Sequence, residues 1–360
     1  MNNSRGSHQE YKLKLKEILA ATLPMHGARL DCLSMLLLAL VQEKTVNLIS
    51  LSLAFQGTAK PESAYRRIKR FVSEVRLGQL RLARLLLNFL PAPPYTVCVD
   101  RTNWQFGSSD INILVIAIVH RGVAVPIVWS VLGKAGNASE DERLELLQTF
   151  LDLVSARDIT FFLADREFIS ETWFHYLDKR AVPFAIRIRK NSLCDGWCPV
   201  ASFFANAPEG ELKVLHHSYS VYGCQLRLCS MKLAGDYAIL ATNRSPHTAF
   251  LAYRQRWCIE MLFAALKTTG FNIETTHLTH PDKLDTLVGL LALAFAWAHH
   301  VGEWLHDSAT KPLKRKAHLS RGVASNPNTS TELLSRLAKD DNVYVRRGAA
   351  RNPNICLEHL

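Results

Sequence analysis

Five short apolar runs rich in β-branched and aromatic residues, with a helical stretch between the third and the fourth, constrain the fold of this chain most strongly. Runs of this length and composition predict strands, and the apolar spacing of the intervening stretch predicts a helix. Elements in this order predict a mixed α/β fold. The predicted strands cover residues 95–99, 111–119, 124–131, 159–164 and 183–188, and the predicted helix covers residues 140–154.

The segments on either side have other patterns. Residues 9–90 have apolar residues at helical spacing and lead into a rigid linker, Pro91-Ala92-Pro93-Pro94. Residues 190–245 contain short alternating runs typical of a small antiparallel insertion, and residues 247–305 return to long helices. The predicted domains are therefore a helical region (1–92), an α/β core (93–310, with the β-rich insertion 190–245) and a tail (317–360).

The tail contains a short repeat. Asn326-Pro327-Asn328 recurs 26 residues later as Asn352-Pro353-Asn354. This pattern resembles the variant leucine-rich repeat, a short helical solenoid unit, but one period and the start of another are too few for a stable stack. We therefore predict an appendage, such as a truncated fusion. So short a repeat gives little support to the alternative that the chain is an interaction protein that works through its tail.

Positive charge is concentrated at the two ends. Residues 1–95 carry 14 Lys and Arg against 6 Asp and Glu, and residues 311–360 carry 10 against 4. Residues 96–310 carry 19 against 22. This distribution favours ends that hold a polyanion around a centre that bears carboxylates. A solvated basic surface is the alternative on charge alone.

Cysteine usage and hydropathy predict a cytoplasmic protein with no membrane segment. The first ten residues are polar, and the eight cysteines are scattered along the chain. The most apolar runs, residues 32–41 and 287–298, are shorter than a bilayer span. Each is interpreted as a buried helix.

A basic helix is predicted within the N-terminal region. Residues 45–72 predict two short helices separated by the break at residues 57–61. A helix-turn-helix places its second helix in the major groove of DNA, where Arg and Lys meet phosphates and guanine edges. A basic helix that only faces solvent is the alternative. The candidate DNA-binding residues on the second helix are Arg66, Arg67, Lys69 and Arg70, accompanied by Ser63 and Tyr65.

Two carboxylates follow apolar strands. Asp100 comes directly after residues 95–99, and Asp165 comes directly after residues 161–164. Ligands of open α/β sheets collect beyond the carboxyl ends of the strands. A single aspartate there is commonly a turn residue or a helix cap, so the pair favours a site without establishing one.

A third carboxylate lies on a helix predicted over residues 248–268. At about 100° per residue, Tyr253, Arg256, Glu260 and Lys267 share a stripe about 60° wide, and the apolar residues of the helix fall on the opposite side. One face thus offers a carboxylate for a metal, flanked by two cations and a phenol suited to phosphate.

The spacing Tyr253-x2-Arg256-x3-Glu260-x6-Lys267 resembles the Y-R-E-K signature of the IS4-type insertion-sequence transposases. The resemblance extends over about residues 30–305. Its flanking segments are Gly136-Asn137 with Glu142-Arg143, Ala164-Asp165-Arg166-Glu167-Phe168-Ile169, and Pro183-Phe184-Ala185-Ile186-Arg187-Ile188.

The resemblance implies an RNase H-like catalytic core with the β-rich insertion between the second and third acids, preceded by a helical DNA-binding region. Asp100, Asp165 and Glu260 would be the catalytic and metal-binding triad. They would hold two Mg²⁺ or Mn²⁺ ions about 4 Å apart, which activate the attacking oxygen and stabilise the leaving one. Tyr253, Arg256 and Lys267 would position terminal phosphates. Arg166 and Glu167 are candidates for support or for simple ion pairs.

The implied reaction is cut-and-paste transposition. Water cleaves the strand at the element's end, and the freed 3′-hydroxyl attacks target DNA. The implied partners are double-stranded DNA (terminal inverted repeats and target) and a second copy of the chain, on the nucleoid of a bacterial cytoplasm. A nuclease without strand transfer and a DNA-binding protein that has lost mobility are the alternatives. All six signature residues are present, which argues against lost chemistry.

The insertion holds two further candidates. Trp197 and Tyr222 would suit stacking on an unpaired base, although core packing is the preferred interpretation, and Trp104 is similarly ambiguous. The cysteine spacings are looser than the C-x2-C of common zinc sites, so reduced structural cysteines are preferred. The cysteines concerned are Cys194, Cys198, Cys224 and Cys229.

Overall fold

The computed structural model describes residues 3–55, 60–233 and 236–308. The described residues up to Ala298 form one compact unit. The predicted tail, residues 317–360, lies outside the described residues. The N-terminal and tail divisions predicted from sequence stay predictions.

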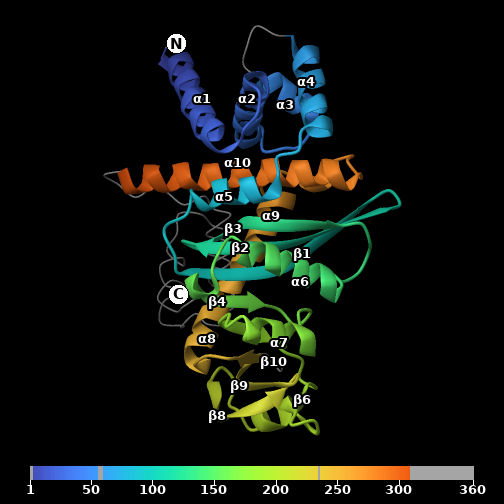
Figure 1. Cartoon of the computed structure of the whole chain (residues 1–360), viewed down its shortest axis with the longest axis vertical. Coiled ribbons are helices and arrows are strands. Elements are labelled where there is room, and N and C mark those ends of the chain that lie inside the picture. Colours follow the sequence, from blue (N-terminus) through green and yellow to red (C-terminus); the bar gives the residue numbers. More distant parts are fainter. Residues whose placement is uncertain (1–2, 56–59, 234–235, 309–360) are drawn as a thin grey trace, which may run out of the picture. The chain divides into compact units, whose positions relative to one another are not determined.

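Helices occupy the N-terminal region, in agreement with its apolar spacing (Figure 1). The Asn47 side chain accepts hydrogen bonds from two backbone N–H groups at the start of α3, and Pro61 begins α4. The two short helices predicted over residues 45–72 are therefore confirmed as α3 and α4. The helices are α1 (Asn3–Thr22), α2 (Gly27–Glu43), α3 (Leu48–Ala54), α4 (Pro61–Glu74) and α5 (Gln79–Leu87).

The centre of the fold is an eight-stranded mixed sheet in the order β3-β2-β1-β4-β5-β10-β9-β8. The first three strands pair antiparallel, β1, β4 and β5 pair parallel, and β5, β10, β9 and β8 pair antiparallel. The strands are β1 (Tyr95–Phe106), β2 (Ser109–His120), β3 (Val123–Leu132), β4 (Ile159–Ala164), β5 (Phe184–Arg187), β8 (Leu212–Val221), β9 (Cys224–Leu233) and β10 (Asp236–Thr242).

Burial explains why these runs form a central sheet. Residues 111–118 of β2 are buried without interruption, as expected for a strand covered on both faces. Ser139 and Glu142 form a capping box at the start of α6, so that helix begins where its sequence predicts. The remaining helices are α6 (Glu140–Leu151), α7 (Glu171–Lys179), α8 (Pro246–Tyr253), α9 (Trp257–Lys267) and α10 (Pro281–Ser308), and the 3₁₀ turns are η1 (Ala156–Asp158), η2 (Val200–Phe204), η3 (Arg254–Arg256) and η4 (Ile273–Thr275).

Most of the segment 190–245 joins the central sheet, which the sequence did not predict. It is antiparallel, as predicted, but β10 pairs with β5, and β9 and β8 extend the central sheet outward (Figure 1). β5 would otherwise be an edge strand with unpaired backbone groups, and β10 covers that edge. A separate two-stranded hairpin is made by β6 (Leu193–Cys194) and β7 (Cys198–Pro199).

Helix α10 joins the N-terminal helices to the sheet. Thr286 donates to the carbonyl of Val75, and Asp285 accepts from the Trp129 indole on β3. The stretch Pro281–Trp304 is long and apolar enough to cross a membrane, so the predicted run 287–298 understated its length. Leu290, Leu291 and Ala294 are nevertheless buried in the core, as in the central helix of a globular fold.

Candidate active site

The pairing of β1 with β4 places the two aspartates side by side. Val99 is opposite Ala164 in this parallel pair, so Asp100 and Asp165 occupy the next position on neighbouring strands. Neighbouring strands are about 4.8 Å apart. The expectation that Asp100 ends its strand is wrong, because β1 continues to Phe106 and Asp100 is opposite Val115 of β2. Only the pairing of β1 with β4 ends at this point.

Glu260 lies near Asp100 on a helical segment that changes from α-helix to 3₁₀ helix and back to α-helix. The predicted helix 248–268 is observed as α8, the 3₁₀ turn η3 and α9. A 3₁₀ turn advances about 120° per residue, so side chains three apart are aligned. Tyr253 and Arg256 are therefore aligned across η3, and the stripe that they form with Glu260 and Lys267 narrows to about 40°.

Arg256 connects two of the three acids. Its Nη1 lies 3.1 Å from Asp100 Oδ2, and its Nη2 donates to Glu260 Oε1. The guanidinium also lies 5.9 Å from the centre of the Tyr253 ring. The side chains of Arg256, Asp100 and Glu260 are 14%, 18% and 35% exposed. The structure thus brings Tyr253, Arg256, Glu260 and Asp100 together, and Asp165 directly follows the adjacent strand β4.

The electrostatics of these groups are coupled. Burial raises the pKa of Asp100 to about 6, against the lowering effect of Arg256, and the neighbouring Glu167 and Asp165 raise it further. Burial also raises the pKa of Tyr253 well above its ordinary value. Burial opposes the charge of Arg256, but Tyr253, Asp165, Asp100 and Glu260 together raise its pKa, so this side chain stays cationic.

Lys267, the fourth residue of the signature, has protein partners of its own. Its Nζ lies 2.7 Å from the carbonyl oxygen of Asn103 and 3.1 Å from Glu274 Oε1, with the Trp104 ring centre 5.6 Å away. Asn103 is three residues beyond Asp100 on β1, or about 10 Å along the strand. Lys267 therefore lies on the same helix face as Glu260 but is not joined to the acids.

A second network, missed by the sequence analysis, surrounds the two aspartates. Arg101 donates to Asn112 Oδ1 (3.2 Å) and Asn137 Oδ1 (3.1 Å) and lies 3.4 Å from Glu167 Oε2. Arg143 donates to the carbonyl of Glu167. Glu167, predicted as a support or an ion-pair partner, is thus the ion-pair partner of Arg101. The sequence signals for this network were Arg101, a charged residue next to Asp100, and Asn112, a polar residue within the apolar run 111–119.

Removing Arg101 should loosen the turn that carries Asp165. We expect Arg101→Gln to lower the free energy of unfolding by about 2 kcal/mol, because it leaves Glu167 without this partner in a half-buried position. Urea unfolding measures the change. Arg76→Gln is the control, since Arg76 pairs with Asp282 at an exposed site and should cost less than about 1 kcal/mol. Equal losses would show that the Arg101 network gives the turn no particular support.

The predicted DNA-binding cations lie on α4 as a group. Arg66, Lys69 and Arg70 are exposed on one side of this helix, opposite the buried Ile68 and Phe71. Arg67 is exposed as well, but its Nη2 donates to the carbonyl of Ala28 at 2.6 Å. Arg67 therefore already ties α4 to the start of α2.

Of the three aromatic candidates, one is exposed and two are packed. Trp197 is 76% exposed at the tip of the β6–β7 hairpin, so the preferred interpretation of a packed core residue is wrong for it. Tyr222 stacks on Phe174 with ring centres 5.3 Å apart and shares a hydrogen bond with Ser192, which is a packed position. Trp104 is 8% exposed and also packed.

The cysteines of residues 190–245 give no sign of a zinc site. Cys194 and Cys198 face one another across the β6–β7 hairpin, and Cys224 and Cys229 lie on β9. Within the described part of the chain, none of them belongs to a group of three possible ligands within 4.8 Å of one another.

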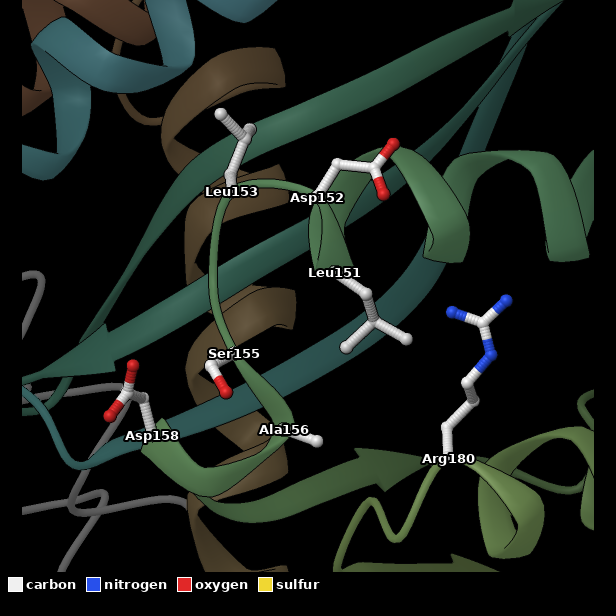
Figure 2. A pocket seen from close by; sticks show the side chains of 7 residues that line it. All are labelled: Leu151, Asp152, Leu153, Ser155, Ala156, Asp158 and Arg180. Atoms are coloured by element: carbon white, nitrogen blue, oxygen red, sulfur yellow. The ribbon is translucent and has the colours of Figure 1, made fainter.

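A surface hollow lies at the carboxyl end of α6, between residues 151–158 and Arg180 (Figure 2). Asp158 and Arg180 lie on opposite sides of it (Figure 2). Asp158 directly precedes β4, whereas Asp165 directly follows it, so the hollow and the aspartates are at opposite ends of this strand. The hollow is not part of the candidate active site.

The central sheet places Asp100 on β1 and Asp165 directly after β4, and Glu260 on α9 is linked to Asp100 through Arg256. The Transposase DDE domain family matches residues 91–297, more than half of the chain. The chain therefore belongs to the DDE transposase family and is a DNA transposase, an enzyme that cleaves and joins DNA strands.

Among solved structures, the chain is similar to the piggyBac transposase synaptic complex with hairpin DNA. The identity is 13% over 97% of this chain and 82% of that chain, and the TM-score is 0.49. No curated protein matches the chain.

Proposed function

We propose that this transposase cuts at the ends of a DNA element and joins the freed 3′-hydroxyl to target DNA, with Asp100, Asp165 and Glu260 as its catalytic acids. The observation that carries this proposal is that Asp100 and Asp165 directly follow the paired residues Val99 and Ala164 of β1 and β4, together with the link from Asp100 through Arg256 to Glu260. The proximity of three acids is unfavourable by charge alone, because like charges repel, so the arrangement requires a cation beside them.

The same acids suit divalent metal ions. Carboxylate oxygens are the ligands that Mg²⁺ and Mn²⁺ prefer, and the partly buried Asp100 needs a cation beside it to hold its charge. We propose that the three acids hold two such ions. When bound, the ions would lower the cost of the charge that develops on the attacking and leaving oxygens of the phosphodiester.

The chain's own residues then bind and orient the DNA end. Arg256 is a planar cation that suits a phosphate, and the nearby Tyr253 presents a phenol whose raised pKa keeps its proton, so it can donate a hydrogen bond. Lys267 would contact the DNA strand farther along β1, after exchanging Glu274 for a phosphate. Water provides the first attacking oxygen and the freed 3′-hydroxyl the second, so no covalent enzyme intermediate is required.

The spacing of Tyr253, Arg256, Glu260 and Lys267 supports assignment to the IS4-type branch, with terminal inverted repeats as the substrate. Pairing of two element ends favours a homodimer on DNA, in the nucleoid of a bacterial cytoplasm. The exposed Trp197 is suited to stacking on an unpaired base at a DNA end.

The decisive assay uses labelled element ends, Mg²⁺ and a target plasmid. We expect nicks that leave a 3′-hydroxyl at the element's end, followed by products joined to the plasmid. Cleavage without joined products would support the nuclease alternative. Specific binding without cleavage would support a DNA-binding protein that has lost mobility.

Helix α4 supports a DNA-binding role for the N-terminal region. α2, α3 and α4 pack on one another, and α4 carries its cations on the exposed side, as in three-helix DNA-binding domains. Arg66, Lys69 and Arg70 are free to meet phosphates without breaking the fold, whereas Arg67 would first release the Ala28 carbonyl.

Neutralising these three cations should weaken DNA binding and reduce its salt dependence. Each lost phosphate contact lowers the slope of log K against log[salt] by about 0.9, so the triple Gln variant of Arg66, Lys69 and Arg70 should lose up to about 2.7. Fluorescence anisotropy at several salt concentrations measures the slope. Arg157→Gln, at an exposed position before β4, should leave it unchanged. An unchanged slope in the triple variant would remove α4 from the DNA interface.

A further inference from the structure

Arg256 holds one carboxylate oxygen of each of two proposed metal ligands, Asp100 and Glu260. Asp100 Oδ1 accepts the backbone N–H of Arg101 at 2.8 Å, and Asp100 Oδ2 is held by Arg256 Nη1 at 3.1 Å. The other end of the same guanidinium holds Glu260 Oε1. An ion held between Asp100 and Glu260 would coordinate oxygens of the same two carboxylates, and Mg²⁺ ligands lie at about 2.1 Å, so the ion would come close to the guanidinium. A guanidinium and a divalent ion on one pair of carboxylates would repel each other strongly at this burial.

Arg256 is built to hold this position without metal. An ion pair with Glu260 alone would need only the spacing of one helical turn, but the guanidinium also reaches Asp100 on β1. It is 14% exposed and lies beside the Tyr253 ring, so it is partly withdrawn from solvent as well as neutralised. Lys267, the second cation of the stripe, is held by Asn103 and Glu274.

We infer that Arg256 is the resident cation of the metal-free site, and that metal binding at Asp100 and Glu260 displaces its guanidinium and makes it available to a DNA phosphate. The inference rests on the proposed function, because it requires these acids to be metal ligands. The consequence is a fixed order of binding, in which metal binds before the phosphate. Arg256 cannot neutralise the acids and hold a phosphate with the same donors. Metal binding and capture of the DNA end are therefore coupled through one residue.

The inference predicts an unusual sign for a substitution beside a metal site. Arg256→Gln removes the competitor for the carboxylates, so the full-length protein without DNA should bind Mn²⁺ at least about tenfold more tightly than the wild type. Mn²⁺ affinity is measured by calorimetry or by the loss of the free-ion EPR signal. Lys134→Gln is the charge-matched control, because Lys134 pairs with Glu142 outside the acids, and it should change the affinity less than about twofold.

The experiment distinguishes failure of the proposed function from failure of the proposed displacement of Arg256. If Asp100→Asn and Glu260→Gln bind Mn²⁺ as tightly as the wild type, the acids are not its ligands and the proposed function fails. If those variants lose Mn²⁺ but Arg256→Gln binds it no more tightly than Lys134→Gln does, only the displacement is overturned. Should Arg256→Gln not fold, Arg256→Lys replaces it. Its single ammonium cannot bridge both acids, so a smaller gain in affinity is expected, and no gain would overturn the inference.

Discussion

Glu260→Gln should reduce strand cleavage by at least about 10³-fold, with the fold intact. Gln keeps the size of the side chain and an oxygen that can accept from Arg256, but it removes a full charge from the proposed metal-binding set. A metal ion stabilises the transition state by several kcal/mol, and each 1.4 kcal/mol is a factor of about ten in rate. Single-turnover cleavage of a labelled element end measures the loss, and circular dichroism reports the fold.

Glu274→Gln is the matched control for this substitution. Glu274 also pairs with a cation, Lys267, and its side chain is 37% exposed against 35% for Glu260. It lies outside the three acids, so cleavage should stay within about threefold of the wild type. Cleavage by Glu260→Gln at the wild-type rate would refute the assignment of Glu260. Equal losses in both variants would attribute the effect to the ion pairs of this helix and not to metal binding.

Asp100→Asn should raise the stability of the metal-free protein at pH 8, although it removes a partner of Arg256. Burial raises the pKa of Asp100 to about 6 in the folded chain, and the value in an unfolded chain is about 3.9. The folded state thus binds this proton more tightly, and the wild type loses stability as the pH rises from about 4 through about 6. The loss is at most about 3 kcal/mol, which corresponds to several degrees in melting temperature.

Differential scanning calorimetry in EDTA at pH 8 and pH 4 tests this result. Asn does not titrate, so the gain should be present at pH 8 and should shrink towards zero near pH 4. With saturating Mn²⁺ the order should reverse, because only the wild type gains the free energy of metal binding. Asp141→Asn, at an exposed position on α6, should show neither effect. A lower melting temperature for Asp100→Asn in EDTA at pH 8 would mean that the Arg256 ion pair outweighs the cost of burial.

Local pattern was enough to predict the parts of the site that depend on single elements. The apolar runs before Asp100 and Asp165 identified the two strands, and helical spacing placed Tyr253, Arg256 and Glu260 on one face. The pairing of β1 with β4, which aligns the aspartates, is a long-range property. Neither strand predicts this pairing by itself.

The remaining contacts were beyond the sequence because they join distant segments. Arg101 meets Glu167 and Asn137 only after β1, β4 and the loop before α6 are assembled. Likewise, the partners of Lys267 follow from where η4 turns back on α9. The continuation of the sheet through β10 was missed because alternating runs do not reveal which strand they pair with.

The 3₁₀ turn at Arg254–Arg256 gives a stereochemical meaning to the intervals of three, four and seven residues that separate Tyr253, Arg256, Glu260 and Lys267. Three residues complete one 3₁₀ turn, four approximate one α-turn, and seven approximate two. The spacing of the motif therefore reflects a 3₁₀ turn followed by an α-helix, in addition to the four side chains. One residue inserted between Tyr253 and Arg256 would rotate the phenol away by at least about 100°, with all four identities unchanged.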